Sequence, residues 1–176
     1  MTNRRRTTQE AHERFTVKLF LENFNKWHRS NFKVISEPNP PEAVVQSGKT
    51  IRWVEVTTAY MNQEFAIDLN SYATDGEQYQ PMTQHVFIGP DAHFAEQFVK
   101  VVKQKLEKQT YASIRDEYGL GYLIVSIQYP MFGRDSLRFI SQAWSKVALK
   151  HANCFRSVYI TYRVFDGYKV VLWKPK

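Results

Sequence analysis

The sequence predicts a single α/β (α+β) domain in which helices cover both faces of a mixed β-sheet. The length of 176 residues suits one domain, and 43% hydrophobic residues are enough for a conventional core. The predicted elements follow the order helix, three strands, two helices, strand, helix and two strands. Because strands alternate with helices along the chain, a mixed sheet is favoured over a helical bundle or a β-sandwich.

The first elements are a long helix and a three-stranded meander. A capping box, Thr7 with Glu10, predicts a helix over residues 8–29. Residues 1–7 before it are expected to form a disordered basic arm. Residues 32–57 predict three antiparallel strands, with a tight turn near Gly48. The apolar stripe of the helix has three- and four-residue spacing: it is headed by Glu13 and continues with Val17, Phe20, Phe24 and Trp27.

The remaining elements follow from caps and apolar runs. Asn62 caps one helix, and an amphipathic helix over 91–111 is capped by its own first residue. Residues 122–127 are almost entirely apolar, which indicates a central strand covered on both faces. Asp135 caps a further helix, and residues 157–173 predict a hairpin.

Charge is distributed unevenly along the chain. Lys and Arg number 24 against 17 Asp and Glu, a net charge of +7. Residues 136–176 contain a single acid and supply the whole excess, whereas residues 37–96 contain nine acidic and two basic residues. The basic tail is a candidate phosphate-facing surface, with Lys146, Lys150 and Arg156 as candidate nucleic-acid contacts.

Several classes of protein are disfavoured. The longest apolar run, residues 121–127, is far shorter than the roughly 20 residues of a membrane span, and no apolar signal region is present. The single Cys154 cannot form an internal disulfide, which favours a reducing compartment, and we expect the cytoplasm. HExxH, GxGxxG and GxxxxGK[ST] motifs do not occur, so zinc catalysis and nucleotide-cofactor chemistry have little support.

Two carboxylates on neighbouring strands form the candidate site. Side chains alternate along a strand, so Glu55 and Thr57 share one face. Antiparallel pairing across the turn near Gly48 brings Glu42 beside Glu55 or Thr57. Like charges across a sheet are destabilising unless a cation lies between them. Either this register is wrong, or the pair binds Mg²⁺ or Mn²⁺, which prefer oxygen ligands.

The same residues carry a resemblance to a known superfamily. Pro41-Glu42, followed by Glu55-Val56-Thr57 on a hairpin between two helices, resembles the motif of the PD-(D/E)XK, or restriction endonuclease-like, nucleases. The motif is short. In this superfamily a metal ion activates a water that attacks the phosphorus of a phosphodiester bond.

The resemblance covers about residues 8–128. It implies an αβββαβ core, to which this chain adds an extra helix and a C-terminal hairpin within the basic extension 129–176. It further implies hydrolysis of nucleic acid, with DNA favoured over RNA. Single-domain members often dimerise to cut both strands, so a homodimer is compatible with the resemblance.

The implied metal ligands are Glu42, Glu55 and the carbonyl of Val56. Glu13 heads the apolar stripe of the first helix and so projects toward the sheet, where the superfamily often supplies a further ligating glutamate. The usual first carboxylate is Asp, and here it is Glu42.

The second departure concerns the lysine of the motif. Thr57 occupies its position and carries no charge, so a cation must come from elsewhere. The helix that follows offers Lys103, Lys105 and Lys108, and lysine migration onto this helix occurs within the superfamily. We assign the catalytic position to Lys105 and nucleic-acid contacts to Lys103 and Lys108.

Two alternatives to catalysis remain open. Loss of the motif lysine is how such sites decay, so the chain could be a catalytically degenerate module that binds nucleic acid or a protein through the same fold. It could also be a structural subunit without a nucleic-acid role. Metal-dependent cleavage separates the first reading from these two, and steep salt dependence of binding separates nucleic-acid readings from the last.

Overall fold

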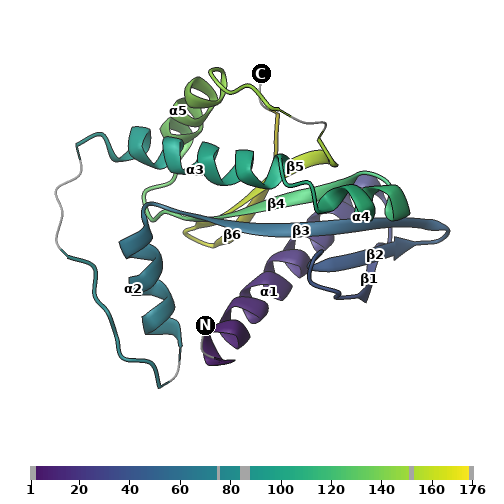
Figure 1. Cartoon of the computed structure of the whole chain (residues 1–176), viewed down its shortest axis with the longest axis horizontal. Coiled ribbons are helices and arrows are strands. Elements are labelled where there is room, and N and C mark those ends of the chain that lie inside the picture. The colour runs from purple at the N-terminus through teal and green to yellow at the C-terminus, as the bar shows by residue number, and fades with distance from the viewer. Residues whose placement is uncertain (1–2, 75, 84–87, 151–152, 175–176) are drawn as a thin grey trace.

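The computed structural model describes residues 3–74, 76–83, 88–150 and 153–174. In this part of the chain, a six-stranded mixed sheet is flanked by five helices, which confirms the predicted α+β class (Figure 1). The elements, in chain order, are α1 (Asn3–His28), β1 (Lys33–Ser36), β2 (Ala43–Ser47), β3 (Thr50–Tyr60), α2 (Gln63–Ala73), α3 (Pro90–Leu106), α4 (Tyr111–Tyr118), β4 (Gly121–Gln128), α5 (Arg134–Trp144), β5 (Phe155–Val164) and β6 (Gly167–Trp173).

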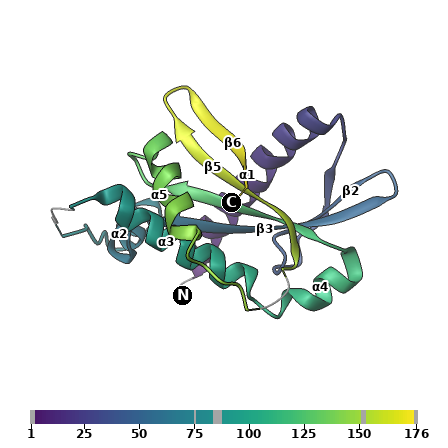
Figure 2. The ribbon, with the colours of Figure 1, turned by 90° about the horizontal axis from the view of Figure 1, so that it is seen from above.

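The strands lie in the sheet in the same order as in the sequence, β1 to β6. The first three form an antiparallel meander, β3, β4 and β5 are parallel, and β5 and β6 form an antiparallel hairpin. β4 pairs with strands on both sides and is buried on both faces, so the predicted central strand is confirmed. Because β3, β4 and β5 are parallel, their C-terminal ends lie at one end of the sheet, as do α2 and the β5–β6 turn (Figure 2).

Each face of the sheet has its own core. α1 covers one face, where Phe20 and Phe24 pack against Val54 and Val56 of β3. α3, α4 and α5 cover the other face, where the fully buried Trp53 of β3 belongs to the core. Neighbouring residues of β3 therefore point to opposite faces, as the period of two predicts. In Figure 1, α3 and α5 lie above the sheet and α1 below it.

The first helix departs from its predicted start. α1 begins at Asn3, so residues 3–7, expected in a disordered arm, are its first residues, and residues 1–2 lie outside the described part. The Thr7–Glu10 pair consequently lies inside the helix and does not cap it. At the other end, Trp27 is 47% exposed although it belongs to the predicted apolar stripe. The stripe thus leaves the core in its last turn.

The predicted helix over 91–111 is two helices. α3 follows the left-handed Gly89, so Asp91 lies in the first turn instead of capping the helix. α3 ends at Leu106, and α4 begins at Tyr111. The cap of α5 is likewise Gly133 and not Asp135. Acids in a first turn are favoured by the helix dipole without being caps.

α2 is only loosely attached to the core. Its predicted cap is confirmed, because Asn62 Oδ1 accepts a hydrogen bond of 2.7 Å from the backbone N–H of Phe65. Ser71 is the only fully buried residue of this helix, and Tyr72 is 80% exposed. Among the described helices, none combines the length and the apolar composition that crossing a bilayer requires.

Candidate functional site

Strand β3 continues beyond its partner β2, which leaves part of one edge open. The last pair of the β2–β3 ladder is Ala43 with Val54, whereas β3 runs on to Tyr60. Immediately before Ala43 and Glu42 the chain holds Pro40 and Pro41, which have no N–H groups with which to extend the ladder. The backbone of β3 after Val54 therefore has β4 on one side and no strand on the other.

Glu42 occupies the start of this open edge. Its Oε2 atom accepts a hydrogen bond of 3.0 Å from the backbone N–H of Val56. The N–H and C=O of one strand residue point to the same side. The Val56 carbonyl consequently faces the open edge too. Because Ala43 pairs with Val54, Glu42 lies opposite Glu55, and the structure brings the two carboxylates together.

Glu55 projects from β3 toward the face covered by α3 and α4 and is 1% exposed. Lys105 Nζ, near the end of α3, lies 2.5 Å from Glu55 Oε1. The hydroxyl of Tyr111, the first residue of α4, donates to the same oxygen. Lys105 Nζ is also 3.3 Å from the Tyr111 hydroxyl. A buried carboxylate is expensive unless it is paired and hydrogen-bonded, and these two residues meet that need at Oε1.

The second oxygen of Glu55 is not satisfied in the same way. With both carboxylates ionised, Oε2 is buried and has no hydrogen-bond partner among the described residues. A proton on Glu42 supplies a donor between the two groups. Burial, and next the neighbouring Glu55, raise the pKa of Glu42 to about 8. At neutral pH the pair therefore holds a proton, because burial and the neighbouring carboxylate outweigh the nearby charge of Lys105.

The oxygen atoms available here fit a hard divalent cation. Among the described residues, no group of three or more His, Cys, Asp or Glu side chains is arranged to hold a metal. Mg²⁺, however, is commonly bound through only one or two carboxylates together with waters and substrate phosphates. The unsatisfied Glu55 Oε2, the proton-binding Glu42 and the Val56 carbonyl form such a set.

A cleft of about 510 Å³ opens beside the carboxylates. It follows the open edge of β3 and is bounded by the first half of α1 and by α2. Glu13, Glu42, Val56, Thr57 and Lys105 all line it. A second hollow, between α1 and the β1–β2 strands, shares Glu13 and Glu42 with this cleft. The two carboxylates thus stand where the two hollows meet.

Glu13 lies close to the pair without touching it. Its Oε1 atom accepts a hydrogen bond of 2.7 Å from Gln9 on the preceding turn of α1. Burial raises the pKa of Glu13, and Lys105 and Glu55 are both near enough to influence it. Glu13 is therefore a third carboxylate at the cleft and not a member of the hydrogen-bonded cluster.

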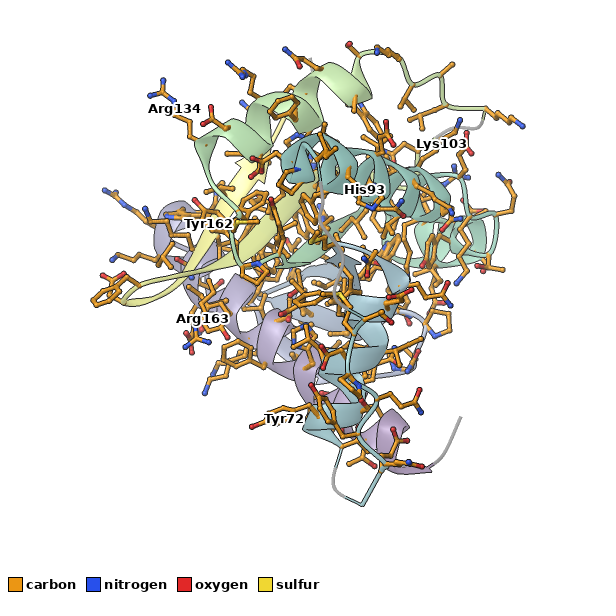
Figure 3. The ribbon with its side chains drawn as sticks, turned by 90° about the vertical axis from the view of Figure 1, so that its left-hand side faces the viewer. Tyr72, His93, Lys103, Arg134, Tyr162 and Arg163 are labelled. Carbon is orange, nitrogen blue, oxygen red and sulfur yellow. The ribbon has the colours of Figure 1, made fainter. Side chains whose placement is uncertain are left out.

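The other basic residues proposed from the sequence lie elsewhere. Lys105 is the only lysine or arginine among the described side chains that line the cleft. Lys108 Nζ lies 5.0 Å from the centre of the Tyr111 ring. Arg156 borders a separate hollow with Tyr159. All five residues that the sequence predicts as nucleic-acid contacts lie outside the lining of the cleft: Lys103 (labelled on α3 in Figure 3), Lys108, Lys146, Lys150 and Arg156.

Two residues of this region were not proposed from the sequence. Tyr111 contacts Glu55. No sequence pattern points to this contact, because the sequence predicts Tyr111 as the last residue of one helix, whereas in the structure it is the first residue of α4. His12 lines the cleft, and its Nε2 atom is 3.1 Å from Ser126 Oγ of β4. Its position was detectable: Gln9, His12 and Glu13 have the three- and four-residue spacing of one helix face.

Comparison of the chain with protein-family models, with curated proteins and with solved structures found no match. The resemblance to the PD-(D/E)XK superfamily consequently rests on the motif residues of the sequence.

Proposed function

We propose that the protein is a metal-dependent nuclease that hydrolyses phosphodiester bonds of DNA or RNA, with DNA favoured, and that Glu42, Glu55 and the Val56 carbonyl hold Mg²⁺ or Mn²⁺. One observation carries this proposal. Two carboxylates from neighbouring strands meet at an open strand edge beside a cleft, and one oxygen of Glu55 has no hydrogen-bond partner among the described residues. A cation that binds there relieves the repulsion that now holds a proton on Glu42.

The superfamily resemblance supports the same function. The order α1, β1, β2, β3, then helices and β4 corresponds to the αβββαβ core that the motif implies. Glu42 precedes β2 and Glu55 lies within β3, the positions in which the superfamily carries its ligands. A restriction endonuclease-like core, a homodimer and a cytoplasmic location remain part of the proposal.

The residues of the chain divide the work as follows. Lys105 and Tyr111 hold Glu55 through Oε1 and leave Oε2 without a hydrogen-bond partner among the described residues. Lys105 replaces the charge that Thr57 lacks, and Thr57 offers a hydroxyl to the phosphate in the cleft. A bound metal ion would supply a Lewis acid that lowers the pKa of water and offsets the charge of the phosphate. Glu13 adds negative charge beside the ligands.

A second candidate is the catalytically degenerate module that binds nucleic acid or a protein. The observation that favours it is the Lys105–Glu55 ion pair, which already neutralises one ligand oxygen. Such a pair can stabilise the fold in place of a metal. In this case the cleft keeps its shape but does not bind Mn²⁺.

Cleavage of mixed DNA and RNA substrates with Mg²⁺, Mn²⁺ or EDTA tests the first candidate. We expect metal-dependent cutting by the wild type and none by Glu42→Gln/Glu55→Gln, which is close to isosteric. Glu96→Gln, an exposed change on α3, is the matched control and should cut normally. No cutting by the wild type, together with no calorimetric binding of Mn²⁺, would refute the nuclease and leave the binding module.

A further inference from the structure

Helix α2 presents an uncovered apolar surface to the cleft. Helices normally bury their apolar stripe in a core. Ser71 is the only fully buried residue of α2, whereas four apolar residues of the helix line the cleft. Ile67 and Leu69 are half-buried there, and Ala73 is exposed at the end of the helix. These residues line the same cleft as the first half of α1 and the carboxylate Glu42.

The charge of the cleft is unsuited to a duplex. The sequence contains no lysine or arginine from Glu55 to Val99, so α2 brings no cation to the cleft. Among the described side chains of the lining, Lys105 is the only lysine or arginine. Proteins that grip duplex DNA neutralise several phosphates at once. The single cation Lys105 can neutralise one phosphate group, which suits a single nucleotide better than a duplex.

The polar groups and the size of the cleft point the same way. Gln63 and Gln128 present side-chain amides, and Thr58 and Tyr60 bring hydroxyls. Amides and hydroxyls bond to the edges of unstacked bases, and apolar side chains pack against base faces. The volume of about 510 Å³ lies within the range of roughly 300–1,000 Å³ that is typical of pockets for single small molecules.

We infer that the cleft binds one unpaired nucleotide of a nucleic-acid strand, with its base against α2 and its phosphate toward Lys105. The substrate is accordingly a single strand or an unpaired end, and not the interior of a duplex. This inference rests on the proposed function, because it names the substrate of that site. It makes its own prediction about binding, which does not depend on hydrolysis.

Fluorescence anisotropy in EDTA tests the inference without cleavage. The probe is a short labelled oligothymidylate, free or annealed to its complement. We expect the single strand to bind at least about tenfold more tightly than the duplex. Equal or tighter binding of the duplex would overturn the inference.

A cleft-filling change then locates the binding. Ile67→Trp should weaken single-strand binding about tenfold, because the indole occupies the space of the base. The matched control is Tyr72→Trp on the same helix, whose side chain is 80% exposed and is drawn projecting outward in Figure 3. Ala73→Trp is a second cleft-filling variant at an exposed position, for use if Ile67→Trp fails to fold. Wild-type affinity in folded cleft-filling variants would place the strand elsewhere and refute the inference.

The two proposals fail separately. If the single strand binds in the cleft and no substrate is cut with any metal, the hydrolytic function is wrong and the inference stands. If duplex and single strand are bound and cut equally, the inference is wrong and the nuclease stands.

Discussion

Lys105 near the end of α3 and Glu55 in the middle of β3 meet at 2.5 Å, although fifty residues separate them in the sequence. The carboxylate is almost fully buried, whereas the lysine side chain is 25% exposed toward the cleft. The pair thus joins a buried strand to the surface at which a phosphate would arrive.

Lys105→Met should destabilise the metal-free protein by about 3 kcal/mol, because it leaves a buried carboxylate without its cation. Lys100→Met, an exposed change on the same helix, should have little effect. Urea denaturation at neutral pH measures both. If a metal binds at Glu55, adding Mn²⁺ should recover part of the loss in Lys105→Met. Unchanged stability of this variant would show that the ion pair is not maintained in solution.

Glu42 makes stability depend on pH. Its folded-state pKa of about 8 lies above the ordinary glutamate pKa of 4.5, so the folded state binds a proton more tightly than the unfolded state. Stability is therefore highest below pH 4.5 as far as this group is concerned, and it falls as pH rises from there toward 8. Glu42→Gln removes this dependence and should raise the unfolding free energy at pH 9, relative to the wild type, on the order of 4 kcal/mol more than at pH 5.

The measurement is urea denaturation of wild type and Glu42→Gln at both pH values in EDTA. Glu37→Gln is the matched control, because Glu37 is an exposed acid in an ion pair with Arg14. An identical difference between Glu42→Gln and wild type at pH 5 and pH 9 would contradict a raised pKa.

Tyr111→Phe tests whether the hydroxyl positions Glu55. The change removes a buried donor to Glu55 Oε1 and should cost about 1–3 kcal/mol of stability. If the site is catalytic, kcat should fall while KM stays unchanged, because Tyr111 does not line the cleft in which we place the substrate. Tyr118→Phe on the same helix is the control. A fall in stability with full kcat would assign Tyr111 a purely structural role.

Thr57→Lys restores the motif of the superfamily at the cleft. We expect it to return cleavage to Lys105→Met, because a lysine on the same strand face as Glu55 can take over the missing charge. Cleavage rates of the single and double variants measure the rescue. Thr50→Lys, an exposed position at the start of the same strand, should not rescue. A double variant as inactive as Lys105→Met would show that position 57 cannot serve the reaction.

The parts of the fold that follow from short-range patterns were predictable. The meander, the central strand β4 and the β5–β6 hairpin arise from alternation and turn residues, and the structure confirms them. Proximity of Glu42 to Glu55 followed from the same alternation and a tight turn. Sequence alone could not choose the lysine that meets Glu55, because this depends on the phase of α3 against the sheet.

Other errors came from helix ends without a marker. α3 ends at Leu106, yet residues 107–110 contain neither glycine nor proline, so the sequence reads as one helix through Tyr111. The interruption moves Tyr111 onto a new helix, where its hydroxyl reaches Glu55. The contact that completes the cluster was therefore hidden by tertiary packing that overrides local propensity.

The proline pair before β2 has a consequence for how this site persists. If β2 began two or three residues earlier, it would pair with β3 through the same backbone groups that now face Glu42. Extension of β2 and ligand binding therefore exclude each other at this edge. Because Pro40 and Pro41 cannot donate hydrogen bonds to β3, β2 begins only after them and the backbone groups of β3 beside the cleft stay available to a ligand.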